Sequence, residues 1–116
     1  MTKYNARTVI MDGYLFGSQA EAARYGELKL LERAGEIRGL VIHPRYSLTV
    51  KDILVGVYEA DFGYVVSETE TLIVEDVKGE PTPVYRLKKK LVRALYGIEI
   101  VEIDAAQYRA RTRSKR

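Results

Sequence analysis

Apolar and polar residues follow different periods along the chain, and each change of period predicts a change of secondary structure. Between residues 18 and 34 the apolar positions approximate one helical face, with Glu and Arg elsewhere. These positions are Ala20, Ala23, Leu28 and Leu31. Gly35 follows directly, and glycine is the usual residue just past a helix end. The pattern predicts a helix over 18–34.

Three segments rich in Val, Ile, Leu and Tyr come next, a composition that favours half-buried strands. They span residues 40–50, 53–66 and 71–78. Pro44 marks a bend or an edge position in the first, because proline cannot donate a ladder hydrogen bond. Earlier in the chain, Asp12-Gly13 indicates a turn in a small hairpin.

A second helix should begin near Pro83 and end at Gly97, before a last strand over 98–103. Its expected apolar side consists of Val84, Leu87, Leu91 and Leu95. The order is helix, three-stranded meander, helix, strand. It predicts an α/β (α+β) fold in which helices flank one mixed central β-sheet.

The composition is that of one folded domain, assigned here to residues 1–108, with 47% apolar and 30% charged residues. The absence of cysteine excludes disulfides and thiolate metal sites. The single histidine, His43, precedes Pro44, where a structural or surface role is the simpler interpretation. No apolar stretch could cross a bilayer and no signal pattern is evident, so we expect a cytoplasmic protein with no membrane partner.

The charge is unevenly distributed. The net charge is +3, and residues 109–116 hold five basic and no acidic side chains, which leaves −2 for residues 1–108. Such a basic C-terminal tail fits binding to a polyanion, although a tail that only aids solubility has the same composition.

Two strand-like segments carry the candidate chemistry. Asp76 and Lys78 are two residues apart, so on a strand they share one face. If the segment that contains Asp61 is the neighbouring strand, its carboxylate can converge on Asp76. Two carboxylates beside an ammonium group suit Mg²⁺, a phosphate and an attacking water.

Each of these residues also has a purely structural interpretation. Ser18-Gln-Ala-Glu21 has the spacing of a capping box, although Glu21 could instead point at the carboxylates of the sheet. Asp61 could belong to a turn with Gly63. Asp76 and Lys78 could form an ion pair on a solvated strand, and a single D-x-K motif is a weak signal.

Several motifs, taken together and in order, resemble a family of small phage-encoded nucleases. It belongs to the PD-(D/E)xK superfamily, which includes phage Holliday-junction resolvases. The resemblance covers about residues 3–103. It is carried by Lys3-Tyr-Asn5, Asp12-Gly13, Phe16-Gly-Ser-Gln-Ala-Glu-Ala-Ala-Arg-Tyr25, Ala60-Asp-Phe-Gly-Tyr64, Glu75-Asp-Val-Lys-Gly79 and the Lys88-Lys-Lys90 helix. Ala60 replaces the proline of the superfamily name, and Gly17 and Gln19 stand where an acidic and a basic residue are expected.

The resemblance implies a restriction-endonuclease-like core and a catalytic set made of Glu21, Asp61, Asp76 and Lys78. Glu21, Asp61, Asp76 and the Val77 carbonyl would hold Mg²⁺, with Mn²⁺ as an alternative. The implied activity is Mg-dependent, structure-selective cleavage of branched or double-stranded DNA, as by a Holliday junction resolvase. Symmetric junction cleavage implies a homodimer. If the gene is phage-borne, the protein would act in the cytoplasm of the infected host cell.

Basic residues outside the catalytic set are the expected DNA contacts. They are Lys3, Arg7, Lys88, Lys89, Lys90, Arg93, Arg109, Arg111 and Arg113. Three alternatives stay open at this point: a nicking or end-processing nuclease on the same fold, a non-catalytic DNA-binding module, and a structural protein with a capped helix and a surface ion pair.

Overall fold

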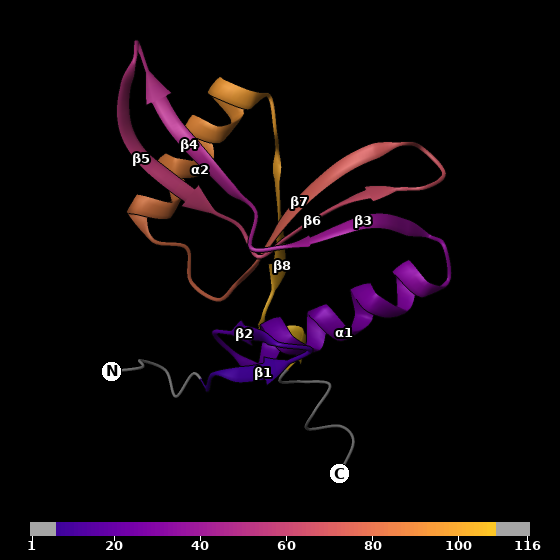
Figure 1. Ribbon diagram of the computed structural model, residues 1–116. Coiled ribbons are helices and arrows are strands. Elements are labelled where there is room, and N and C mark those ends of the chain that lie inside the picture. The colour runs from indigo at the N-terminus through magenta and orange to yellow at the C-terminus, as the bar shows by residue number, and fades with distance from the viewer. Residues whose placement is uncertain (1–6, 109–116) are drawn as a thin grey trace.

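A mixed four-stranded sheet forms the centre of the computed structural model, which describes residues 7–108 (Figure 1). Its strands, in spatial order, are β3 (Ile37–Ile42), β6 (Phe62–Val66), β7 (Thr71–Lys78) and β8 (Ile100–Asp104). The β3–β6 and β6–β7 pairs are antiparallel, whereas the β7–β8 pair is parallel. The crossover between the two parallel strands contains α2 (Pro83–Tyr96), as parallel pairing requires.

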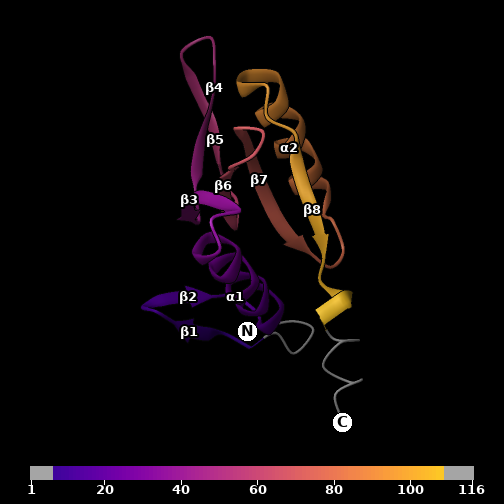
Figure 2. The same cartoon turned by 90° about the vertical axis from the view of Figure 1, so that its right-hand side faces the viewer.

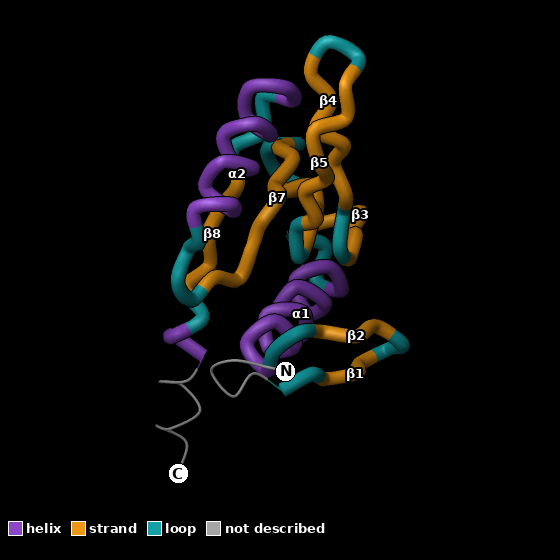
Figure 3. Tube along the Cα trace, turned by 90° about the vertical axis from the view of Figure 1, so that its left-hand side faces the viewer, coloured by secondary structure: helices purple, strands orange, loops and turns teal. Residues whose placement is uncertain are grey.

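The two helices lie on opposite sides of this sheet, with α1 (Gln19–Arg33) on one side and α2 on the other (Figures 2 and 3). Strand β7 contributes to both hydrophobic cores because its side chains alternate. Ile73 and Val77 pack with the cluster under α1, and Val74 packs with the cluster under α2. The predicted fold class, a mixed central sheet flanked by helices, is confirmed. Within residues 7–108, no helix has the length and apolar character needed to cross a membrane.

The ends of both helices follow from local capping residues. Ser18 Oγ accepts the Glu21 N–H at 3.1 Å, and Thr82 Oγ1 accepts the Tyr85 N–H at 3.1 Å. At the other ends, Gly35 and Gly97 adopt φ of 82° and 70°, a left-handed conformation that glycine adopts without steric cost. The helix ends expected from the sequence are therefore right to within about one residue.

The apolar faces expected for the helices are mostly wrong. In α1 the buried residues are Ala22, Tyr25 and Leu28, so only Leu28 was on the expected face. In α2 the buried residues are Tyr85 and Val92, whereas the expected Val84, Leu87 and Leu95 are exposed and Leu91 is half-buried. The reason is that a tyrosine can bury its ring while its hydroxyl finds a polar partner. Tyr25 donates to Asp12 and Tyr85 donates to Glu102.

Strands β3 to β6 form one antiparallel ribbon that bends sharply in its middle. Its inner half is the β3–β6 pair, and its outer half is the hairpin of β4 (Arg45–Val50) and β5 (Ile53–Glu59). Two backbone bonds continue the ladder through the bend: His43 N–H to Asp61 O and Ala60 N–H to Pro44 O, both 2.9 Å. Figure 1 shows the outer hairpin leaving the sheet and running beside α2. The bend expected at Pro44 is thus confirmed. It divides the expected strands 40–50 and 53–66 in two, whereas the expected strand 71–78 is intact as β7.

The register of the ribbon is set near its tip. Lys51 and Asp52 form the connecting turn with φ of 49° and 66°, the conformation that two-residue hairpin loops favour. A register shift between Leu48 and Thr49 then displaces the pairing by one residue. As a result, His43 lies opposite Asp61. The expected small hairpin at Asp12-Gly13 is also present, as β1 (Val9–Met11) and β2 (Tyr14–Phe16).

Candidate metal and catalytic site

The bend of the ribbon brings three potential metal ligands together. His43 and Asp61 are cross-strand neighbours at the bend, and such pairs project their side chains to the same face. Glu21, in the first turn of α1, approaches them from the side. One ligand atom from each of the three residues lies within 4.8 Å of the other two, and all three residues are half-buried.

The N-terminus of α1 determines where the Glu21 carboxylate lies. The capping box expected at Ser18 is half present, because Ser18 accepts the Glu21 N–H as predicted. The Glu21 carboxylate, however, accepts the Gly17 N–H at 3.2 Å and not the cap amide. A Cβ at position 17 would lie 3.3 Å from Glu21 Oε2, so glycine leaves room for this carboxylate. Glu21 is therefore both a helix-end residue and a member of the cluster.

Asp61 binds β7 at the bend of the ribbon. Its Oδ2 accepts the Val77 N–H at 2.7 Å, and its own N–H donates to Asp76 Oδ1 at 3.0 Å. Ala60, just before it, donates its N–H to the ladder at the bend. A proline at position 60 would lose that bond because it has no backbone N–H.

Asp76 and Lys78 share one face of β7, as their spacing predicts. The Asp76 carboxylate is almost fully buried and accepts a hydrogen bond from the Tyr58 hydroxyl. Lys78 Nζ lies 3.9 Å from Asp76 Oδ2 and 4.0 Å from the centre of the Tyr85 ring. The ring supports the lysine through a cation–π contact while its side chain stays 30% exposed. The ammonium group is thus fixed beside the carboxylates and open to solvent.

Burial and mutual repulsion make the carboxylates hard to ionise together. Burial raises the pKa of Asp61 to about 8, and the negative charges of Glu21 and Asp76 contribute to this increase to a smaller extent. Burial also raises the pKa values of Glu21 and Asp76. A bound divalent cation would compensate the charge of these three groups. The donor set, carboxylate oxygens with one imidazole, fits such an ion chemically.

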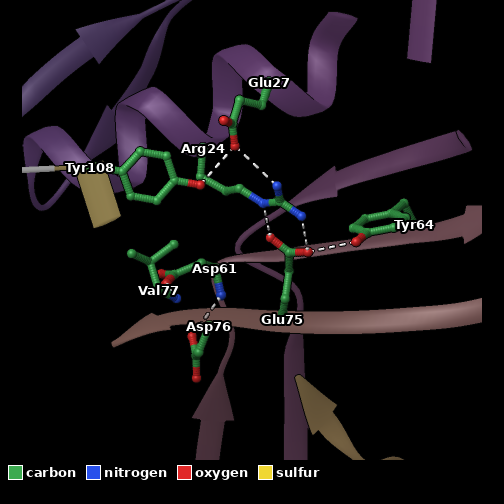
Figure 4. A network of polar contacts seen from close by, with 8 residues as sticks. All are labelled: Arg24, Glu27, Asp61, Tyr64, Glu75, Asp76, Val77 and Tyr108. Atoms are coloured by element: carbon green, nitrogen blue, oxygen red, sulfur yellow. Dashed lines mark hydrogen bonds and ion pairs between the residues drawn. The ribbon is translucent and has the colours of Figure 1, made fainter. Parts of the chain in front are cut away.

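On the opposite face of β7, Glu75 belongs to a closed polar network (Figure 4). Arg24 of α1 binds it with a two-pronged contact, Nε to Oε1 at 2.7 Å and Nη2 to Oε2 at 2.9 Å. The Tyr64 hydroxyl donates to Glu75 Oε2 at 2.6 Å. Arg24 also binds Glu27, which accepts a hydrogen bond from the Tyr108 hydroxyl. The hydrogen bond to Glu75 raises the pKa of Arg24, so the guanidinium keeps its charge. The network fixes α1, and with it Glu21, against β7.

The basic residues expected to contact DNA occupy different environments. Lys89, Lys90 and Arg93 line a hollow between α2 and β8, together with Arg86. A second hollow shares Pro81 and Glu102 with the first and extends to Lys78. Lys89 and Arg93 also form ion pairs there, with Glu102 and Glu99.

The other expected contacts lie elsewhere. Lys88 points toward the hairpin, where its Nζ donates to the Val57 carbonyl at 2.8 Å, and Arg7 is exposed at the start of the described chain. Lys3, Arg109, Arg111 and Arg113, and with them the tail 109–116, lie outside the described residues.

Three neighbours of the cluster were not expected from the sequence. His43 was assigned a structural or surface role, yet it lies beside Glu21 and Asp61. Tyr58 and Tyr85 hold Asp76 and Lys78 in place. The pairing of the two strand segments was the signal that could have located His43, because it sets which residue lies opposite Asp61.

Comparison with known proteins assigns a family. Residues 1–110 match the family model described as "Protein of unknown function (DUF1064)", and the chain therefore belongs to this family. No curated protein and no solved structure matches the chain significantly.

Proposed function

We propose that this member of the DUF1064 family is a divalent-metal-dependent DNA endonuclease whose preferred substrate is a four-way junction. The observation that supports the proposal is the convergence of Glu21, Asp61, Asp76 and Lys78 around the bend of the ribbon. Three carboxylates and a lysine at the end of two neighbouring strands are the groups that phosphodiester hydrolysis uses. The resemblance to PD-(D/E)xK nucleases assigns roles to the same four side chains.

The proposed cation is Mg²⁺, with Mn²⁺ as an alternative, held by Asp61, Asp76 and Glu21 together with the Val77 carbonyl. The Val77 N–H points to Asp61, whereas the Lys78 carbonyl accepts from Ala105 on the other side of the strand. Because successive residues of a strand direct their backbone groups to alternate sides, the Val77 carbonyl is expected on the side of Asp61. A bound ion would polarise the scissile phosphate and make a water more acidic.

Lys78 has the position required to act on the attacking water and on the phosphate. Its Nζ is held between Asp76 and the Tyr85 ring and remains accessible. In the proposed reaction it orients or helps to deprotonate the water and offsets the negative charge that develops on phosphorus. Tyr58 keeps Asp76 in place through its hydroxyl, and so acts as a positioning residue.

The proposed DNA path runs from Lys78 along the basic flank of α2. The two hollows, which share Pro81 and Glu102 in their walls, extend from Lys78 to Arg86, Lys90 and Arg93. Contacts of this type bind phosphates without reading bases, so binding should weaken steeply with salt. Selection of a junction would then depend on the shape of the branched DNA.

The proposed active form is a homodimer, because symmetric cleavage of a four-way junction needs two active sites related by a twofold axis. Large apolar side chains left exposed on α2 and on the outer hairpin, such as Leu87 and Ile53, are compatible with a protein contact. The molar mass in solution, measured by light scattering, tests this part of the proposal. A DNA substrate of this kind would place the protein in the cytoplasm of the host cell.

The decisive test compares Asp76→Asn with the wild-type protein on a labelled four-way junction, with and without Mg²⁺. We expect Asp76→Asn to lower the cleavage rate at least about 10³-fold while junction binding is retained, since a ligand is lost but the basic surface is not. Asp52→Asn is the matched control, because it makes the same chemical change in the tip turn of the hairpin and should cleave normally. Normal cleavage by Asp76→Asn would refute the assignment of the site.

The choice of substrate tests the finer proposal separately. Junction, linear duplex and single strand of equal length are compared at one enzyme concentration. Equal cleavage of junction and duplex would reject the resolvase and keep the nuclease. Tight binding without cleavage, in either Mg²⁺ or Mn²⁺, would favour the non-catalytic DNA-binding module.

A further inference from the structure

We infer that His43 is a direct metal ligand, and that it makes the site prefer cations that accept nitrogen as well as oxygen, such as Co²⁺ and Zn²⁺, over Mg²⁺. The inference rests on the proposed metal site at Glu21 and Asp61 and adds a property that the four catalytic residues do not give. It concerns metal binding, so it can be tested without DNA.

The geometry supports ligation by His43. A ring nitrogen of His43, a Glu21 oxygen and an Asp61 oxygen lie within 4.8 Å of one another. Ligand atoms about 2.1 Å from one transition ion lie about 3.4 to 4.2 Å from one another, depending on the coordination geometry, so shifts of less than about 1 Å would close the three around an ion. The backbone of His43 is fixed by its N–H bond to Asp61, and its ring lies 5.9 Å from the Phe16 ring, centre to centre.

The backbone conformation of His43 is one that residues other than histidine also adopt. Its φ is 55°, in the left-handed region that favours glycine and where Asn, Asp and His are the most frequent residues with a side chain. Glycine or asparagine would adopt this conformation at lower cost, of the order of 1 kcal/mol. The bend therefore does not require histidine at this position. An imidazole directed at two carboxylates is a chemical reason for its presence.

The nitrogen ligand separates classes of cation. Mg²⁺ binds oxygen ligands and keeps much of its water, so replacing one of its waters by an imidazole adds little to the binding free energy. First-row transition ions accept imidazole readily, and their affinities rise along the series from Mn²⁺ to Cu²⁺. The carboxylates of Glu21 and Asp61 can serve either class. The difference in affinity between Mg²⁺ and the transition ions should therefore depend on His43.

The sequence allows a direct test, because His43 is the only histidine of the chain. Tag-free, full-length protein labelled with ring-¹⁵N histidine gives NMR signals from this imidazole alone. One equivalent of Zn²⁺ should move one ring nitrogen to the shift of a metal-bound imidazole, whereas Mg²⁺ at saturation should leave that pattern absent. Zn²⁺ bound stoichiometrically by calorimetry with both ring nitrogens unchanged would overturn the inference.

The matched variant is His43→Asn, because asparagine tolerates the left-handed backbone and lacks the imidazole. Calorimetric titration should show a loss of Zn²⁺ and Co²⁺ affinity of about 10- to 100-fold and a change in Mg²⁺ affinity below about threefold. Equal losses for both classes would show that His43 acts only through the shape of the bend. An unchanged circular dichroism spectrum and melting temperature confirm that the variant folds.

The outcome is separable from that of the proposed function. If the wild-type protein cuts junctions but His43→Asn keeps its metal preference, the inference fails and the nuclease proposal stands. If the imidazole binds Zn²⁺ but no DNA is cleaved with any metal, the nuclease proposal fails and the metal site stands.

Discussion

Glu75 and Asp76 are consecutive carboxylates on β7, and their surroundings differ in almost every respect. Glu75 faces α1 and is matched by the guanidinium of Arg24 and the hydroxyl of Tyr64. Asp76 faces the other side, next to Asp61, and its nearest cation is Lys78 at 3.9 Å. Figure 4 shows the two side chains pointing away from each other. The alternation of one strand thus separates a neutralised acid from a group of acids in excess of nearby cations.

This difference indicates how a structural acid is distinguished from a functional one. A buried carboxylate that only stabilises the fold is paired, because an unpaired buried charge is costly. The raised pKa values of Glu21, Asp61 and Asp76 indicate that this compensation is missing in the cluster around Asp61. Such clusters are found preferentially at functional sites. Substitutions on the two sides should therefore have opposite effects on stability.

The largest effect on stability is expected for Arg24→Ala, which leaves the fully buried Glu75 without its cation. We expect a loss of about 3–5 kcal/mol in the free energy of unfolding, measured by urea denaturation. Arg38→Ala is the control, since its ion pair with Glu70 is exposed to solvent, and little change is expected. Arg24→Lys should be intermediate because it keeps the charge without the two-pronged contact. Equal effects of Arg24→Ala and Arg38→Ala would contradict the structural role of Glu75.

A smaller effect of opposite sign is expected for Asp61→Asn in metal-free buffer. The pKa of Asp61 is about 8 in the folded protein and lies near 3.8 ordinarily, so the folded state holds this proton more tightly than the unfolded state. This contribution to stability is present below about pH 4 and is lost as the pH rises through 8. At pH 8.5 Asp61→Asn should be more stable than the wild-type protein by about 1–3 kcal/mol.

The measurement is urea denaturation in EDTA at pH 5.5 and pH 8.5. Groups away from the cluster titrate equally in both proteins, so the difference between the two pH slopes reports Asp61 together with the carboxylates coupled to it, Glu21 and Asp76. Identical slopes for the two proteins would mean that Asp61 is not protonated in the folded state at neutral pH.

The smallest effect is expected on the basic flank of α2, which lies outside both carboxylate environments. Lys90→Ala should weaken junction binding about two- to fivefold at 0.1 M salt and reduce the salt slope by about one, because one phosphate contact is lost. Arg33→Ala, in the last turn of α1, is the matched control and should bind normally. Binding measured by fluorescence anisotropy at several salt concentrations decides between them.

The fold was largely predictable from local signals. Capping residues and glycines located both helices, and β-rich segments located the strands of the sheet. The buried faces of the helices were not predictable, because the apolar pattern does not show that Tyr25 and Tyr85 bury their rings. Whether a tyrosine belongs to the buried face of a helix can be decided only when a polar partner for its hydroxyl is known.

The candidate site was predictable in part. The shared face of Asp76 and Lys78 follows from the two-residue period of a strand. The position of His43 depends on the register shift between Leu48 and Thr49, without which Ala60 and not Asp61 would lie opposite it. The pairing of Arg24 with Glu75 joins residues 51 positions apart, which no local pattern indicates. The catalytic role of the cluster stays a prediction.

The bent ribbon also has a mechanical consequence. The outer hairpin joins the sheet through two peptide segments, 43–44 and 60–61, and each of them carries a side chain of the cluster. A force applied at the distant tip would rotate the hairpin about the bend and so displace His43 and Asp61. Two hydrogen bonds from α2 to the hairpin oppose that rotation: Lys88 to the Val57 carbonyl and Tyr96 to the Ser47 carbonyl. Their strength sets how rigidly the spacing of the His43 and Asp61 side chains is maintained.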